Sequence, residues 1–329
     1  MFFSLGTPPF VSELRRDGKT RSPLIEFFIF ILLSMIGQAV GGVLTTPYVL
    51  VSLLSDERFF AAYNEVMSTM DVSAIYTYID EKTLELMASP WYMLFMLLST
   101  LGTIAAVLVY ARKIDKRSYA SLGLTRRGLL PYLGGFVLGL VAALVALLFS
   151  AAFGSLWLEG ISPDFNAPIA LLLLLGFVVQ GFSEELLCRG LLMTSLSRGL
   201  KLWMAVIVSA LAFASLHSGN PSLGVIGYIN LFLFGVLLSL YMIRRGSIWG
   251  AAALHTAWNF AEGVLFGSPV SGMNMGVSLL RLGLREGDSL IHGGAFGAEG
   301  GIAVTFVLAF GIAILLMMRT KDDQSAKAP

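Results

Sequence analysis

Residues 176–193 read GFVVQGFSEELLCRGLLM and place Glu184, Glu185 and Arg189 inside an apolar run. The run extends from about residue 169 to about residue 196, which is long enough to cross a bilayer as a helix. An ionisable side chain near the bilayer centre costs roughly 2.5 to 3.5 kcal/mol on insertion scales. Because several such residues in one helix need a compensating reason, this stretch is the first candidate for a functional site.

The composition of the whole chain is typical of a membrane protein. Of its 329 residues, 56% are hydrophobic and only 13% are charged, whereas a soluble domain carries about 25% charged residues. The formal net charge of +1 gives no basic excess for a nucleic-acid backbone, so we expect no nucleic-acid partner. A single cysteine forms neither an intramolecular disulfide nor a thiolate cluster for structural zinc.

The apolar pattern predicts an all-α fold, a polytopic membrane helical bundle with about eight transmembrane helices. Long unbroken apolar runs favour helices over the short alternating strands of a β-barrel. The predicted segments lie near residues 24–54, 91–111, 129–153, 169–196, 202–217, 223–243, 248–266 and 301–318.

The basic residues predict the orientation of these helices. One set of alternate connections carries 17 Lys and Arg residues, and the opposite set carries four. By the positive-inside rule both termini are cytoplasmic, and we expect an integral protein of the bacterial plasma membrane. Two long loops, 55–90 and 268–300, then lie outside. The first is amphipathic enough for an interfacial helix, but we expect it to form a solvated cap.

The two adjacent glutamates have different surroundings within their helix. Glu185 precedes Arg189 by four residues, which is the favourable order for an ion pair, so we assign this pair to structural support. Glu184 lies about 100° around the helix from Glu185 and has no basic partner in the same segment. Glu184 is therefore the carboxylate available for chemistry.

Two later segments also carry polar residues: His217 lies at nearly the same depth as Glu184, and His255 and Asn259 lie less deep. Glu184 is 13 residues before the inner turn and His217 is 16 residues after it, roughly 20 and 24 Å from the same face at about 1.5 Å per residue. His255 and Asn259 lie one turn apart on one helix face, roughly 10 to 17 Å deep. Helix tilt would bring them closer to Glu184. Hydrogen bonding between helices is the structural alternative for each of these residues.

Three motifs stand in order along the chain: EELLCR at 184–189, FASLH at 213–217 and HTAWN at 255–259. With this order and spacing the chain resembles the CPBP intramembrane endopeptidases. That family contains type II CAAX prenyl endopeptidases and bacteriocin-processing or immunity proteins. The resemblance covers residues 169–267, about a third of the chain.

The resemblance implies hydrolysis of a peptide bond within the membrane. Glu184 and His217 would activate a water, and His255 with Asn259 would stabilise the oxyanion. The implied partners are the lipid bilayer and a membrane-associated peptide or protein, of which a lipidated, CAAX-like substrate is one form. No cofactor is implied, because the family is better described as metal-independent.

The same resemblance divides a single membrane domain, 1–329, into three parts. Residues 168–267 form the CPBP-like catalytic core. Residues 1–167 provide N-terminal helices and an outer loop of unknown role. Residues 268–329 provide an outer loop and the C-terminal helix.

Three alternatives remain open. Glu and His ligands could bind zinc with a water as the fourth ligand, although there is no HExxH motif. A proton-coupled transporter also uses intramembrane Glu, His and Arg, although no inverted repeat is present. A non-catalytic immunity or scaffold protein could share the fold, because fold does not establish activity.

Four other polar or reactive residues lie in or near the predicted helices but are not part of the predicted catalytic set. Tyr228 and Asn230 are interpreted as packing polar groups, and Glu262 as a marker of the outer interface. Cys188 lies one turn from Glu184 and, with a histidine and an asparagine nearby, would imitate a thiol-protease set. A buried cysteine normally behaves as a small, inert hydrophobic residue, so we expect Cys188 to serve packing.

The orientation can be tested with fused reporters. Reporters placed after Gly160 and after Pro269 should report an outside location, and those after Arg117 and after Lys321 an inside location, because of the distribution of basic residues. An external reporter after Arg117 would show that the predicted helix count is wrong.

Overall fold

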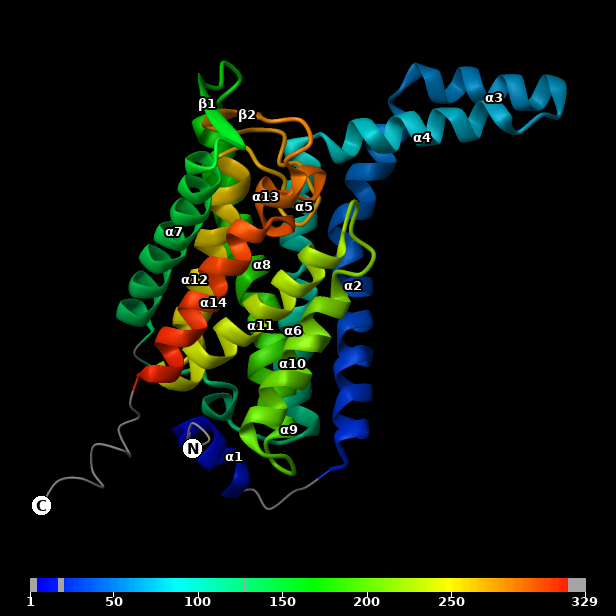
Figure 1. Cartoon of the computed structure of the whole chain (residues 1–329). Helices are drawn as coiled ribbons and strands as arrows, with labels where there is room; N and C mark the ends of the chain where they lie inside the picture. Colours follow the sequence, from blue (N-terminus) through cyan, green and yellow to red (C-terminus); the bar gives the residue numbers. More distant parts are fainter. Residues whose placement is uncertain (1–4, 17–20, 127, 319–329) are drawn as a thin grey trace, which may run out of the picture.

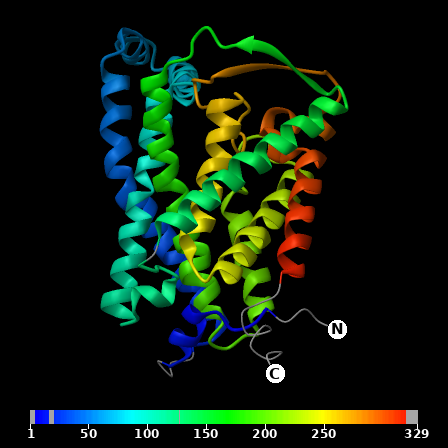
Figure 2. The same ribbon diagram turned by 90° about the vertical axis from the view of Figure 1, so that its left-hand side faces the viewer.

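The computed structural model describes residues 5–16, 21–126 and 128–318. Its main body is a bundle of long helices whose ends lie at two opposite levels (Figures 1 and 2). In chain order the bundle consists of α2 (Pro23–Leu54), α5 (Pro90–Ser99), α6 (Leu101–Val109) with the π-helical turn η1 (Tyr110–Ile114), α7 (Leu129–Ala152), α8 (Ala167–Glu185) with the π-helical segment η3 (Leu186–Met193) and α9 (Thr194–Leu196), α10 (Leu202–Leu216), α11 (Val225–Arg245), α12 (Ile248–Phe260) with the π-helical turn η4 (Ala261–Leu265), and α14 (Ile302–Met317).

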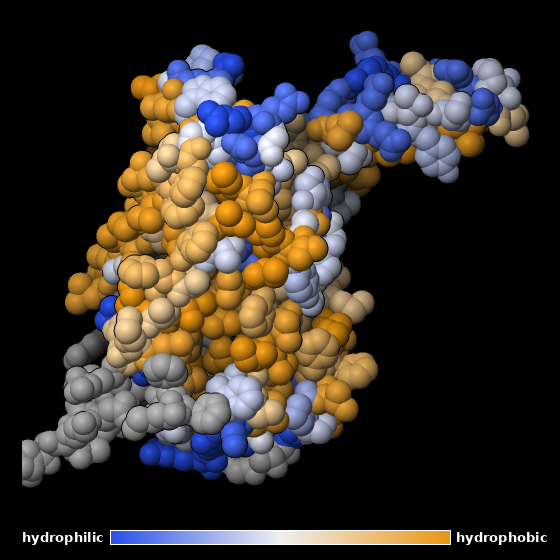
Figure 3. All heavy atoms as spheres, viewed as in Figure 1, coloured by the Kyte–Doolittle hydropathy of each residue, from blue (hydrophilic) through white to orange (hydrophobic). Residues whose placement is uncertain are grey.

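Each of the eight predicted apolar segments is helical over most of its length. Figure 3 shows a broad apolar band over the bundle, with hydrophilic residues at its two ends. The all-α membrane bundle is therefore confirmed, and crossing by all eight helices stays a prediction. Within the described residues, α10 and α14 are apolar but shorter, and five continuous helices are long and apolar enough to cross a membrane: Pro23–Leu54, Pro90–Ile114, Leu129–Ala152, Ala167–Leu196 and Val225–Arg245.

Small residues let α7 and α12 approach closely. A Cβ atom at Gly135 or Gly139 of α7 would overlap the carbonyl oxygen of Gly250 or Leu254 on α12. Between helices in lipid, close van der Waals packing of this kind replaces the hydrophobic effect as a source of association. The contact fixes the position of α12, which carries two of the predicted site residues.

The helix that begins as α8 changes its hydrogen-bonding pattern directly after Glu185. Residues Leu186–Met193 form the π-helical segment η3, and every one of them is buried. π-Helical segments inside α-helices are rare and are frequently found at functional sites. The apolar pattern predicts one regular α-helix here and gives no signal for the change.

A small antiparallel sheet covers one end of the bundle. Its strands are β1 (Leu156–Ile161) and β2 (Leu280–Leu284), paired with Leu156 opposite Leu284. The all-α prediction omits this sheet. The strands are far apart in the chain, and burial does not alternate along β1, so the period-two pattern of a strand is missing.

The loop at 55–90, for which the sequence predicts a solvated cap, forms a projecting pair of antiparallel helices, α3 (Glu57–Thr69) and α4 (Ser73–Met87) (Figure 1). Ion pairs hold its base, where Lys82 Nζ and an Arg58 terminal nitrogen each lie 2.8 Å from Asp56 Oδ2. Hydrogen bonds from Arg58 and Lys82 hold the pKa of Asp56 well below its usual range. The loop is thus a defined helical hairpin.

The loop at 268–300, which the sequence predicts to be the second outer loop, folds back against the helices. It contains α13 (Ser289–His292) and the short 3₁₀ helices η5 (Gly294–Phe296) and η6 (Ala298–Gly300). The buried Asn230 side chain donates hydrogen bonds to the carbonyls of Glu299 and Gly301, at 2.8 and 2.9 Å. Asn230 therefore anchors this loop to α11.

A charged network lies at the opposite end of the bundle, beside α1 (Pro9–Arg16) and the 3₁₀ helix η2 (Tyr119–Leu122). Arg198 lies 2.8 Å from Asp115 and 3.3 Å from Glu26, and Arg21 lies 2.9 Å from Asp115. Burial would raise the pKa of Asp115, but the hydrogen bond and charge of Arg198 lower it below its usual value. The helix α1 and the end of α14 lie at this same end (Figures 1 and 2).

Asp115→Asn should lower the free energy of unfolding at neutral pH by about 3 kcal/mol, because it breaks a buried ion pair. Since folding lowers the pKa of Asp115, its contribution is present above the usual carboxyl pKa of 3.8 and is lost as the pH falls below 3.8 and through the lowered pKa of the folded state. Thermal unfolding of the protein in detergent at neutral and acidic pH measures this. Asp164→Asn, at an exposed position, is the control. Equal losses in both variants would contradict the prediction.

Candidate active site

A cavity of about 290 Å³ lies between α2, α5, α8, α10 and α12. All four residues predicted to be catalytic, Glu184, His217, His255 and Asn259, line it. They come from α8, the end of α10 and α12, so segments that are separate in sequence meet at one place.

The carboxylate of Glu184 has two different oxygen environments. Its Oε1 accepts a hydrogen bond from Gln180 Nε2 at 2.6 Å. Its Oε2 lies 3.9 Å from His217 Nε2 and 3.8 Å from His255 Nε2. These distances exceed a direct hydrogen bond, and among the described residues Oε2 has no direct hydrogen-bond partner. One oxygen is therefore held by the protein, and the other faces both histidines.

His217 caps the C-terminal end of α10, and the backbone fixes its ring. Its Nδ1 lies 2.9 Å from the carbonyl oxygen of Phe213. A carbonyl only accepts hydrogen bonds, so we assign the hydrogen to Nδ1. In the neutral ring, Nε2 then presents its lone pair toward Glu184.

His255 is fixed by a carboxylate. Its Nδ1 lies 3.0 Å from Glu185 Oε1, and the same oxygen lies 3.0 Å from an Arg189 terminal nitrogen. The side chains of Glu185 and Arg189 are 0% exposed. The predicted supporting ion pair is therefore present, and in addition it orients the ring of His255, a link that sequence reasoning missed.

Asn259 belongs to the same polar network through a residue that sequence reasoning also missed. Asn259 Nδ2 donates to Gln180 Oε1 at 3.1 Å. Gln180 lies one turn before Glu184, and this spacing was a usable signal. Gln180 carries no charge whose burial is costly, and it lies outside the three motifs.

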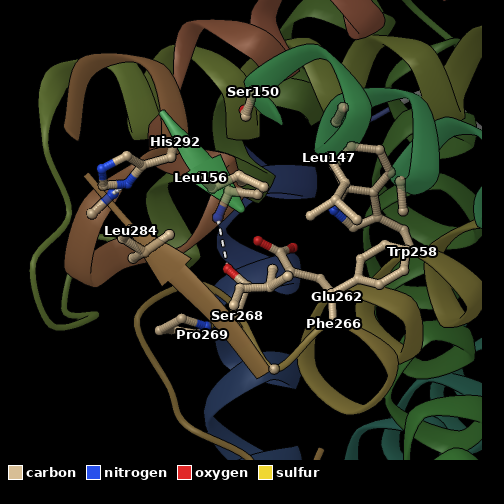
Figure 4. Close-up of a pocket in the computed structure, with 16 residues that line it drawn as sticks. Leu147, Ser150, Leu156, Trp258, Glu262, Phe266, Ser268, Pro269, Leu284 and His292 are labelled. Carbon is tan, nitrogen blue, oxygen red and sulfur yellow. Dashed lines mark hydrogen bonds between the residues drawn. The ribbon is translucent and has the colours of Figure 1, made fainter. Parts of the chain in front are cut away.

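Two residues considered beside the catalytic set lie elsewhere. Cys188 is fully buried and is not among the described residues that line the cavity. Glu262 points into a second cavity, of about 60 Å³, beside Trp258 and Phe266 (Figure 4). Its Oε1 accepts a hydrogen bond from the backbone N–H of Glu299 at 3.2 Å, so it helps to hold the outer loop.

The arrangement of potential metal ligands bears on the zinc alternative. Across residues 5–16, 21–126 and 128–318, no group of three or more His, Cys, Asp or Glu side chains has an arrangement that would hold a metal ion. The metal-free chemistry expected from the motifs stays a prediction.

Residues 166–261 match the family model described as type II CAAX prenyl endopeptidase Rce1-like. The matched range contains all three motifs, so the predicted resemblance to the CPBP proteases is confirmed for this segment. Among curated proteins no match was found. The chain is therefore a membrane protein in which one segment is similar to a protease family.

The two glutamates should respond differently to substitution. Arg189→Ala leaves the buried Glu185 without its cationic partner, at a cost of about 3 to 5 kcal/mol, whereas Glu184→Gln keeps the fold. Fluorescence-detected size exclusion after heating in detergent compares the two variants. A larger loss of stability in Glu184→Gln would reverse the assignment.

Proposed function

We propose that the protein is an intramembrane endopeptidase that hydrolyses a peptide bond of a membrane-associated substrate. The observation that carries this proposal is the convergence of a carboxylate, two histidines and an asparagine in one cavity of a membrane bundle. Amide hydrolysis needs a base, donors for the oxyanion and restricted access of bulk water. The family match supports the same class of reaction.

In this mechanism Glu184 Oε2 removes a proton from the attacking water. The lone pair of His217 Nε2 accepts the second hydrogen of that water and so directs the oxygen toward the substrate carbonyl carbon. The new C–O bond gives a tetrahedral oxyanion. Glu184 then returns its proton to the amide nitrogen, the C–N bond breaks, and a carboxylic acid and an amine leave.

The oxyanion receives hydrogen bonds from Asn259 and His255. One hydrogen of Asn259 Nδ2 is used by Gln180, and the second remains for the substrate. His255 Nδ1 already donates to Glu185, so donation from Nε2 as well requires the imidazolium form, for which Glu185 is the counter-charge. Removal of one such donor typically costs about 10² to 10³ in turnover.

The walls of the cavity favour an apolar substrate segment. Methionines line it from α5 and from the second outer loop, at Met93, Met96, Met273 and Met275. Methionine side chains adapt to irregular apolar ligands. Together with the CAAX endopeptidase match, this favours cleavage next to a lipidated or otherwise apolar anchor of the substrate.

We extend the proposal to topology and location. All eight apolar segments would cross the bilayer of a bacterial plasma membrane as one domain, with both termini cytoplasmic. Support comes from α1 and the end of α14, which lie at the same end of the bundle as required by an even number of crossings. In this orientation the sheet and the helical hairpin face outward.

The test is a comparison of protein termini in membranes from cells that express the wild-type protein or Glu184→Gln at equal levels. New termini should appear only with the wild type, because Glu184 supplies the base. Cys188→Ala is the matched control and should preserve cleavage, since its thiol lies outside the cavity. Chelator treatment should also leave cleavage intact, which separates this mechanism from zinc hydrolysis.

Identical termini in wild-type and Glu184→Gln membranes would contradict the proposal and favour a transporter or a non-catalytic immunity or scaffold role. Loss of cleavage in Cys188→Ala with activity in Glu184→Gln would favour a thiol mechanism.

A further inference from the structure

Gln180 connects two of the proposed catalytic residues on different helices. Its Nε2 donates to Glu184 Oε1 at 2.6 Å, and its Oε1 accepts from Asn259 Nδ2 at 3.1 Å. Gln180 lines the same cavity as both partners. The amide therefore bridges the proposed base on α8 and the proposed oxyanion donor on α12.

The chemistry of these groups fixes the direction of the bridge. A carboxylate only accepts hydrogen bonds, so the amide NH₂ of Gln180 must face Glu184 and its carbonyl must face Asn259. With the opposite orientation of the amide, oxygen would face oxygen at Glu184 and NH₂ would face NH₂ at Asn259. The partners thus leave a single arrangement of the Gln180 amide.

This arrangement determines which atoms remain for the substrate. Because Gln180 occupies Glu184 Oε1, the other oxygen faces the two histidines. Because Gln180 receives one hydrogen of Asn259 Nδ2, the second hydrogen of that amide remains available. A single side chain therefore orients both the base and an oxyanion donor.

A second hydrogen bond, independent of Gln180, also joins α8 to α12. One turn earlier on α8, the carbonyl oxygen of Phe177 accepts a hydrogen bond from Thr256 Oγ1 at 3.1 Å. The Thr256 side chain is fully buried and does not contact the four proposed catalytic residues in any described hydrogen bond. Thr256 thus provides a hydrogen bond between the same two helices without the link to the site.

We infer that Gln180 is a positioning residue of the proposed peptidase, which sets the geometry of Glu184 and Asn259 together. The inference rests on the proposed function and deepens it. Its role is exerted through the two residues that it contacts, and a small displacement of reacting groups is enough to slow an enzyme substantially.

Gln180→Met tests the role with a side chain of similar length that has neither amide group. It should lower kcat by about 100-fold while KM changes less than about twofold, because the alignment of catalytic groups is lost and the apolar substrate contacts remain. Gln180→Glu keeps the acceptor for Asn259 but loses the donor to Glu184, so it should also lose most of kcat. Cleavage of a membrane-embedded reporter by purified, reconstituted protein gives both constants.

Thr256→Val is the matched control, because it removes the hydroxyl that bonds the carbonyls of Phe177 on α8 and Ala252 on α12 and leaves the Gln180 bridge intact. It should lower thermal stability and leave kcat within about twofold. In an Asn259→Ala background, Gln180→Met should cost less than it does alone, because the two residues share one function.

The outcomes separate this inference from the proposed function. Normal kcat in Gln180→Met or Gln180→Glu beside an inactive Glu184→Gln would overturn the positioning role and keep the peptidase. Equal losses of kcat in Thr256→Val and Gln180→Met would also overturn it, in favour of simple helix attachment. An active Glu184→Gln would contradict the proposed function itself.

Discussion

A buried carboxylate in an apolar bundle needs a partner of opposite charge or a hydrogen-bond donor, and the partners of Glu185 connect the helices that carry the candidate site. Its Oε1 lies 3.0 Å from both Arg189 and His255, and the Glu185 side chain is 0% exposed. A charge in this setting is costly unless opposite charge and hydrogen bonds compensate it. The same oxygen therefore joins η3 to α12 and fixes the histidine ring.

This pairing explains why two adjacent glutamates have different environments. Glu185 faces the interior of the bundle and its two partners, whereas Glu184, on the neighbouring helix face, reaches the cavity. The Glu184 side chain is 21% exposed, and among the described residues its carboxylate makes a direct hydrogen bond only with Gln180. Packing of α7 against α12 through glycines, and closure of the outer loop by Asn230, keep these helices in place.

The bundle and the meeting of Glu184 with His217 could be predicted from strong, local signals, whereas the meeting of these residues with His255 and Asn259 was implied by the family resemblance. Long apolar runs mark helices in a membrane, and His217 meets Glu184 because two antiparallel helices of known rise connect through one turn. The pairing of Glu185 with Arg189 followed from their spacing on one helix.

The remaining features depend on contacts that residue spacing does not encode. The π-helical segment η3 has the same apolar composition as an α-helix, and β1 pairs with a strand more than a hundred residues later. The hydrogen bond from His255 Nδ1 to Glu185 Oε1 joins two helices, so i, i+4 reasoning within one helix does not reveal it. Gln180 has a neutral amide, and a rule based on the cost of burying charge does not single it out.

The most direct test of the central claim is mass spectrometry of a membrane-embedded reporter after incubation with purified, reconstituted protein in ¹⁸O-labelled water. If Glu184 activates water for amide hydrolysis, the wild type will yield a new C-terminus that carries one ¹⁸O atom, and Glu184→Gln will yield none. An uncut reporter with the wild type, or equal labelled product from Glu184→Gln, would contradict the account.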